Sequence, residues 1–291
     1  MSIKAMIIDF HVHIAYKDSN KKCSVDDIIN AMNDAGIDIS VLLGNDQADA
    51  GYKRPWINSS IMPMDVNLSD EELSSYCFSH PDRLIGFTSV HPDRYKPHKK
   101  VLRAIKEFGM KGLKLYPHAG FYPNDKRLDL VYEKCVEYDI PVMFHTGIKA
   151  LSWQNLKYNN PIYVDDIATN FPELKIIMCH GGYPWVEEFM VVAYSNPNMW
   201  VDITFLDYIE KIYKKPNLSE DTIKRLVELI GAKKLLWGTE GPYLNLSLFG
   251  SHGPEYYIKS QDFLVKRFDF LTEKDKENIL GENARELLRI N

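Results

Sequence analysis

The stretch Ile3-Lys4-Ala5-Met6-Ile7-Ile8-Asp9-Phe10-His11-Val12-His13 decides the fold of this chain. The apolar run over residues 3–8 predicts a fully buried strand. Side chains two residues apart on a strand point to the same side, so His11 and His13 are expected to project together from the strand's end. Two neutral imidazoles placed side by side make up half of a typical site for a first-row metal.

The bulk composition predicts a single large domain over residues 1–291. The chain has 291 residues, of which 45% are hydrophobic, and this is enough for one large core. A net charge of −5 argues against binding to nucleic acid or to an anionic membrane. No apolar stretch approaches the length that spans a bilayer. Four widely spaced cysteines, no CxxC pair and no expected signal peptide predict reduced thiols in a cytoplasmic protein.

Seven further apolar runs follow the first, and helical patterns separate them. These strands are expected at residues 39–43, 84–90, 111–116, 141–144, 175–179, 200–203 and 234–238. The helices are expected at residues 24–35, 69–80, 96–108, 128–138, 164–171, 185–194, 219–230 and 254–290, with Ser219 as the N-cap of the seventh. This alternation is typical of parallel strands with helical crossovers, and eight repeats match a (β/α)8 TIM-type barrel. A doubly wound open sheet is the alternative.

Polar residues stand where these strands end, which is the active-site end of such a barrel. They are His11, His13, His91, Lys114, Tyr116, His145, His180, Asp202 and Glu240. Two or three imidazoles with one carboxylate and an open coordination position suit a catalytic zinc ion or a similar divalent metal. Such an ion lowers the pKa of bound water and polarises a carbonyl group.

Three of these residues have several possible roles. His180 precedes two glycines, which allow a ligand to approach closely, and it could be a ligand, a general base or a group that polarises the substrate. Lys114 could neutralise a substrate carboxylate, be carbamylated to bridge two metals, or pair with a neighbouring acid. Asp202 either orients a histidine or faces outward.

The remaining histidines are expected to be structural or solvated. His80 and His91 each begin a His-Pro-Asp-Arg run, in which Pro-Asp is typical of a turn. His118 lies in the loop after the fourth strand and is expected at the surface. The polar residues 45–67 form an unusually long connection, which predicts a functional loop or lid.

Several short motifs stand in order along nearly the whole chain. They are Asp9-x-His11-x-His13, Pro81-Asp82-Arg83-x-Ile85-Gly86-Phe87, Gly112-Leu113-Lys114-Leu115-Tyr116-Pro117, the strand before His145, His180-Gly181-Gly182, Leu236-Trp237-Gly238-Thr239-Glu240 and Ile279-Leu280-Gly281-x-Asn283-Ala284. Together they resemble the amidohydrolase-related family, the branch of the amidohydrolase superfamily that contains aminocarboxymuconate-semialdehyde decarboxylase and the pyrone-dicarboxylate hydrolases.

The resemblance implies a distorted barrel with one divalent metal, usually zinc, with manganese as the other possibility. It implies metal ligands at His11, His13, His145 and position 240, and a catalytic group at His180. Position 240 departs from the family, which has aspartate there. Glu240 is one methylene longer, so its carboxylate must retract or the metal must shift.

Three functions are compatible with these residues. The first is a metal-dependent hydrolase of a small lactone, ester or amide, in which metal-activated water attacks the carbonyl while His180 or Glu240 handles protons. The second is a non-oxidative decarboxylase of an aromatic or unsaturated acid. The third is a metal-free barrel that only binds a ligand. Lys114, Tyr116 and Arg54 are the candidate substrate-binding residues, the partner is a small molecule, and family resemblance makes a homodimer possible.

Overall fold

The chain folds into a barrel of eight parallel strands. The computed structural model describes residues 6–14, 22–46, 68–149, 154–242, 245–246, 250–251 and 255–290. The strands pair in sequence order and are β1 Ile8–His13, β2 Ile39–Leu43, β3 Leu84–Ser89, β4 Gly112–Leu115, β5 Val142–Phe144, β6 Ile176–Cys179, β7 Met199–Asp202 and β8 Leu235–Leu236. A separate short antiparallel pair joins β9 Asn245–Leu246 and β10 Gly250–Ser251.

Backbone contacts close the barrel between its first and last strands. The Phe10 amide donates to the Trp237 carbonyl at 3.0 Å, and the His13 amide donates to the Glu240 carbonyl at 3.1 Å. Val12 and Glu240 form an isolated parallel bridge. The (β/α)8 barrel is therefore confirmed, and the open sheet is excluded.

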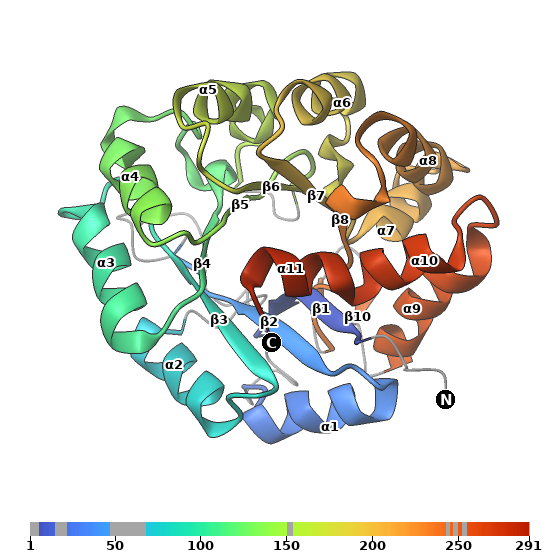
Figure 1. Cartoon of the computed structure of the whole chain (residues 1–291), viewed down its shortest axis with the longest axis horizontal. Helices are drawn as coiled ribbons and strands as arrows, with labels where there is room; N and C mark the ends of the chain where they lie inside the picture. Colours follow the sequence, from blue (N-terminus) through green and yellow to red (C-terminus); the bar gives the residue numbers. More distant parts are fainter. Residues whose placement is uncertain are drawn as a thin grey trace.

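Helices surround the barrel and cover its outer face (Figure 1). They are α1 Val25–Ala35, α2 Asp70–Ser79, α3 Pro97–Phe108, α4 Asp129–Glu137, α5 Ile162–Asn170, α6 Val186–Ser195, α7 Leu206–Ile212, α8 Leu218–Ile230, α9 Glu255–Arg267, α10 Glu273–Glu277 and α11 Asn283–Leu288. A π-helical turn, Asn278–Glu282, joins the last two. Among the described helices, none combines the length and the apolar composition needed to cross a bilayer.

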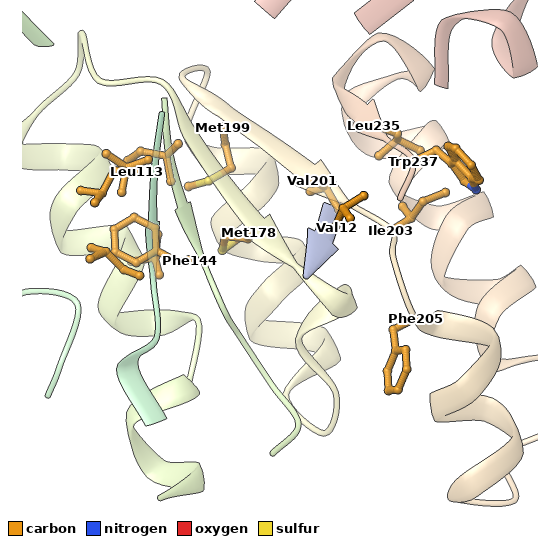
Figure 2. Close-up of a cluster of buried hydrophobic side chains, with 14 of the residues drawn as sticks. Val12, Leu113, Phe144, Met178, Met199, Val201, Ile203, Phe205, Leu235 and Trp237 are labelled. Carbon is orange, nitrogen blue, oxygen red and sulfur yellow. The ribbon is translucent and has the colours of Figure 1, made fainter. Parts of the chain in front are cut away.

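The two faces of the strands bury different sets of apolar residues, because side chains alternate along a strand. The outward set packs beneath the helices and includes Leu113, Phe144, Met178, Val201 and Leu235 (Figure 2). The inward set fills the barrel and includes Ile8, Phe10, Phe87, Met143, Ile177 and Leu236. Ala284 and Leu287 of α11 pack against the inward set and cover the N-terminal end of the barrel.

The first strand lies later in the sequence than predicted. The apolar run suggested residues 3–8, but β1 runs from Ile8 to His13, and residues 1–5 lie outside the described part of the chain. The strand continues past the apolar run because Val12 and His13 pair with Leu42 and Leu43 of β2. The two histidines therefore belong to the strand itself.

Three helical predictions also need correction. Ser219 is not the N-cap of α8: that position is Asn217, which makes no side-chain capping bond, and Ser219 is buried within the helix. The short helix α7 was not predicted, because its single buried face, Leu206 and Ile209, is too brief to show a period. The tail predicted as helical over residues 254–290 is divided into α9, α10, the π-helical turn and α11, with a break at residues 268–272. The remaining strands and helices lie close to the predicted ranges.

Candidate metal centre

His11, His13 and Glu240 meet at the C-terminal end of the barrel. His11 Nε2 lies 3.1 Å from His13 Nε2 and 3.3 Å from Glu240 Oε1. His13 Nε2 lies 3.4 Å from Glu240 Oε2. All three residues are buried, so two imidazoles and one carboxylate share a small space shielded from water. This donor set is one that divalent metals bind.

Local backbone irregularities bring these three side chains together. The β1–β2 register shifts between Asp9 and Val12, which turns His11 and His13 inward above Phe10. Glu240 has φ +72°, and this left-handed conformation changes the direction of the chain after β8. Asp9 accepts from the Thr239 amide at 3.0 Å and thereby ties the segment before Glu240 to β1.

Asp202 fixes the orientation of His11. Asp202 Oδ2 lies 2.5 Å from His11 Nδ1, and both side chains are fully buried. The Thr204 amide donates to the other carboxylate oxygen at 2.9 Å. His11 Nδ1 is therefore the protonated nitrogen, and its Nε2 presents a lone pair to Glu240 and His13. Of the two alternatives for Asp202, the structure shows the inward one.

His145 and His180 form a second pair beside the first. His180 Nδ1 donates to the Thr204 carbonyl at 3.0 Å, and His145 Nε2 donates to the Ile148 carbonyl at 2.7 Å. The other nitrogens, His180 Nε2 and His145 Nδ1, face each other at 3.2 Å. Two lone pairs at this distance repel unless a proton or a cation lies between them. His180 Nε2 is also 3.7 Å from Glu240 Oε1, which connects the two pairs.

Burial keeps these imidazoles neutral. It lowers the pKa of His11, His13 and His180 well below the ordinary value, and it lowers the pKa of His145 to about 3. The positive charge of Lys114 contributes to each of these shifts. Neutral imidazole is the form that binds a metal, so the site can accept a cation at neutral pH without first losing protons from these rings.

The three predicted substrate-binding residues differ in where the structure places them. Lys114 is fully buried inside the barrel, and its Nζ lies 3.2 Å from Cys179 Sγ. Tyr116 is buried too; its hydroxyl donates to the Gly44 carbonyl at 2.9 Å, and its ring centroid lies 6.1 Å from that of His13. Arg54 lies outside the described residues, as does most of the predicted loop at residues 45–67.

The structure also brings Cys179 into the site, although the sequence predicted only a reduced thiol at this position. The donor atoms of His11, Cys179 and His180 lie within 4.8 Å of one another. Among the described residues, His145 belongs neither to this group nor to that of His11, His13 and Glu240. The one signal in the sequence was the position of Cys179 directly before His180.

His118 and His91 are both buried. The expectation of a surface position for His118 is wrong: its ring packs edge-on against His145 with centroids 4.4 Å apart, and its Nε2 lies 2.9 Å from Gln154 Nε2. The three-residue helical turn after β4 folds His118 inward. His91 Nδ1 accepts from the Asp93 amide at 3.1 Å, and the His91 carbonyl accepts from the Arg94 amide at 3.1 Å, which closes the predicted turn.

Comparison with known proteins places the chain among one group of barrels. A family model described as Amidohydrolase matches residues 8–290. The 2-amino-3-carboxymuconate-6-semialdehyde decarboxylase of Dictyostelium discoideum is 24% identical over 247 residues, which are 75% of this chain and 65% of that protein. The chain thus spans less than two thirds of the length of the curated relatives that it matches.

Two solved structures share the fold over nearly their whole length. A probable 2-pyrone-4,6-dicarboxylic acid hydrolase from Acinetobacter baumannii, solved with citric acid, has a TM-score of 0.68 at 16% identity, covering 98% of this chain and 99% of that one. The 5-carboxyvanillate decarboxylase of Novosphingobium aromaticivorans, solved with manganese, has a TM-score of 0.68 at 14% identity, covering 99% and 97%.

Proposed function

Because the chain belongs to the amidohydrolase family, we propose that it is a metal-dependent enzyme that hydrolyses a small lactone, ester or amide. The observation that carries this proposal is the convergence of two buried imidazoles and one buried carboxylate at the C-terminal end of the barrel. Active sites of such barrels lie at this end.

The metal ligands in this proposal are His11, His13 and Glu240. Their donor atoms face one another, and Asp202 holds His11 with its Nε2 toward the other two. Zinc fits these residue types, and manganese is the alternative, in keeping with the manganese of the decarboxylase neighbour. A divalent ion held there would polarise a substrate carbonyl and acidify water. His145, the fourth ligand expected from the resemblance, would need to turn from His180 toward this group.

His180 is the proposed proton-handling group. Its Nδ1–H is anchored on the Thr204 carbonyl, so its Nε2 is held with the lone pair toward the site. Burial lowers its pKa, so this nitrogen is unprotonated at neutral pH, and the same shift makes it a weaker base than a free imidazole. Glu240 Oε1 lies 3.7 Å away and is the second group that can exchange a proton there.

The proposed substrate contacts are Lys114, Tyr116 and Arg54. Lys114 supports this role because it is a buried cation without a carboxylate partner within salt-bridge distance among the described residues. A cation in that position is suited to a substrate carboxylate. The Tyr116 ring lies near both Lys114 and His13, with its centroid 5.5 Å from the ammonium nitrogen and 6.1 Å from the His13 ring.

Decarboxylation of an aromatic or unsaturated carboxylic acid is the second candidate function. Lys114 is the observation that favours it, because a decarboxylase must hold the carboxylate that it removes and a buried ammonium offers the required charge. In this reaction His180 Nε2 would first take up a proton from solvent and then pass it to the carbon that loses carbon dioxide.

Products formed in 18O-labelled water separate the two reactions. Metal-loaded protein would be incubated with a panel of lactones, esters, amides and aromatic carboxylic acids, and the products analysed by mass spectrometry. Hydrolysis places one 18O atom in the product and releases no carbon dioxide, which is the expected result. Carbon dioxide release without net addition of water would overturn the hydrolase in favour of the decarboxylase. Absence of turnover across the panel with a fully loaded metal site would count against both.

Other features of the protein stay predictions. We propose one domain over residues 1–291, supported by a single family model that matches residues 8–290. A small-molecule substrate is in keeping with the names of the relatives. The homodimer, the cytoplasmic location and the lack of nucleic-acid and membrane partners are expectations from the sequence.

A further inference from the structure

Cys179 and His180 are consecutive, yet both side chains face the centre of the site. Cys179 is the last residue of β6, and its thiol points into the barrel with Ile177. The next side chain on a regular strand would point outward. His180 instead has φ +64°, and this left-handed conformation turns its imidazole back toward His145 and Glu240.

This arrangement creates a second donor group that overlaps the first. The donor atoms of His11, Cys179 and His180 lie within 4.8 Å of one another, and all three residues are at most 1% exposed. His11 belongs to both groups. Asp202 occupies the Nδ1 of His11, so only its Nε2 can bind a metal, and the two groups are therefore alternative positions for a single ion.

The two positions differ in the chemistry of their donors. His13 and Glu240 add nitrogen and oxygen to His11, whereas Cys179 and His180 add sulfur and nitrogen. Sulfur ligands favour zinc, and carboxylate ligands suit manganese. Lys114 supports the sulfur position, because its ammonium lies 3.2 Å from Sγ and stabilises the negative charge that a thiol acquires when it binds a metal and releases its proton to solvent.

We propose that Cys179 is a sulfur ligand that draws zinc, but not manganese, toward His180. This inference rests on the proposed function only in requiring that the site hold a divalent ion. In the zinc form, His180 would bind the metal through the lone pair of its Nε2. In the manganese form, the ion stays with His13 and Glu240, and His180 keeps its lone pair for proton transfer. Cys179 would thus distinguish the two ions and decide whether His180 is a ligand or a base.

X-ray absorption at the metal edge tests the proposal without any substrate. Metal-free protein would be loaded with one equivalent of zinc or of manganese. We expect one sulfur neighbour at about 2.3 Å from zinc, beside nitrogen and oxygen neighbours at about 2.0–2.1 Å. We expect only nitrogen and oxygen neighbours around manganese.

Two variants identify the sulfur. Cys179→Ser should remove the sulfur neighbour while zinc stays bound through His11, His13 and Glu240. Cys77→Ser, on the half-buried face of α2, is the matched control and should keep it.

The wild-type spectrum decides the question even where a variant fails to fold. Bound zinc with only nitrogen and oxygen neighbours would overturn the role of Cys179 and leave the proposed function intact. Sulfur around manganese as well as zinc would overturn the selectivity. Failure of both ions to bind would overturn the proposed function and this inference together.

Discussion

The same strands build two layers inside the barrel, and the layers differ sharply. The lower layer is apolar; its members are Ile8, Phe10, Phe87, Met143, Ile177 and Leu236. The upper layer is polar and equally buried; its members are His11, Lys114, Cys179 and Asp202. Along β1 the change takes place between Phe10 and His11, which are neighbours in the chain. Along β1, the apolar layer and the polar layer are therefore separated by a single residue.

The backbone differs between the layers as well. The left-handed residues His180 and Glu240 lie at the upper layer, and the register shift between Asp9 and Val12 lies where β1 passes from Phe10 to His11. A non-glycine residue in the left-handed region costs roughly 1–3 kcal/mol, which the surrounding structure must offset. The regular lower layer can supply this stability, because its side chains pack without such distortions. The comparison suggests that substitutions in the lower layer act on stability and substitutions in the upper layer act on activity.

The largest effect is expected for His180→Asn in the upper layer. Asparagine tolerates the left-handed backbone and its amide can keep the bond to the Thr204 carbonyl, but it offers no nitrogen at the Nε2 position. We expect kcat of the manganese form to fall about 10²- to 10⁴-fold, with unchanged manganese content. Steady-state kinetics on the substrate found by the 18O screen would measure this.

His91→Asn is the matched control, because His91 is equally buried but lies at the end of β3 against Phe121. Its kcat should stay close to the wild-type value. Equal losses of activity in the two variants would indicate that His180 acts only through packing.

Phe87→Ala should lower the stability of the protein and leave its catalytic activity nearly unchanged. The Phe87 ring is fully buried, meets Phe10 edge-on with centroids 5.6 Å apart, and lies so close to Gly112 that a Cβ there would be 2.4 Å from the ring. We expect this substitution to lower the free energy of unfolding by about 3–5 kcal/mol. Urea denaturation monitored by circular dichroism would measure the change. Activity per folded molecule should change little. A stable Phe87→Ala protein with a lost metal site would break the separation of the two layers.

The smallest effect concerns pH. Burial lowers the pKa of His118 well below 6.5, so the folded state keeps the ring neutral while the unfolded chain binds a proton below pH 6.5. The stability that goes with this neutral ring is present above pH 6.5 and is lost as the pH falls. Below pH 6.5, His118→Gln should make the dependence of the unfolding free energy on pH shallower, by up to about 1.4 kcal/mol per pH unit.

Urea unfolding in the presence of a chelator would measure these slopes. Asn159→Leu removes a side chain that contacts His118 but leaves the titrating ring, so it should lower stability equally across the range. Identical slopes for wild type and His118→Gln would show that His118 is protonated in the folded state.

The order of strands and helices could be predicted from the sequence, because short apolar runs typical of buried strands alternate with segments of helical periodicity. Residues 39–43 are β2 as predicted, and the other apolar runs end within a few residues of the observed strands. The exception is β1, because the apolar run predicts a strand that ends at residue 8 and the observed strand runs from Ile8 to His13. His11 and His13 are polar because they face the site, and the backbone pairing of Val12 and His13 with Leu42 and Leu43 has no local signal in the sequence.

The site was predicted less completely. His11, His13 and Glu240 do gather, because strand ends of a closed barrel must lie together. The distance between His145 and that group depends on the ring orientation that Ile148 imposes, and no spacing rule gives it. His118 was missed because a helical turn folds it inward. Cys179 was missed because the left-handed backbone at His180 lets two consecutive side chains face the site.

Metal analysis of the purified protein tests the central claim most directly. Protein prepared without chelator or metal-affinity tag would be compared by inductively coupled plasma mass spectrometry with a His11→Ala/His13→Ala double variant, with Glu240→Ala and with His91→Asn. We predict close to one equivalent of zinc or manganese in wild type and in His91→Asn, none in the double variant, and a reduced amount in Glu240→Ala. A folded wild-type protein that stays empty after incubation with both ions would contradict the metal centre proposed here.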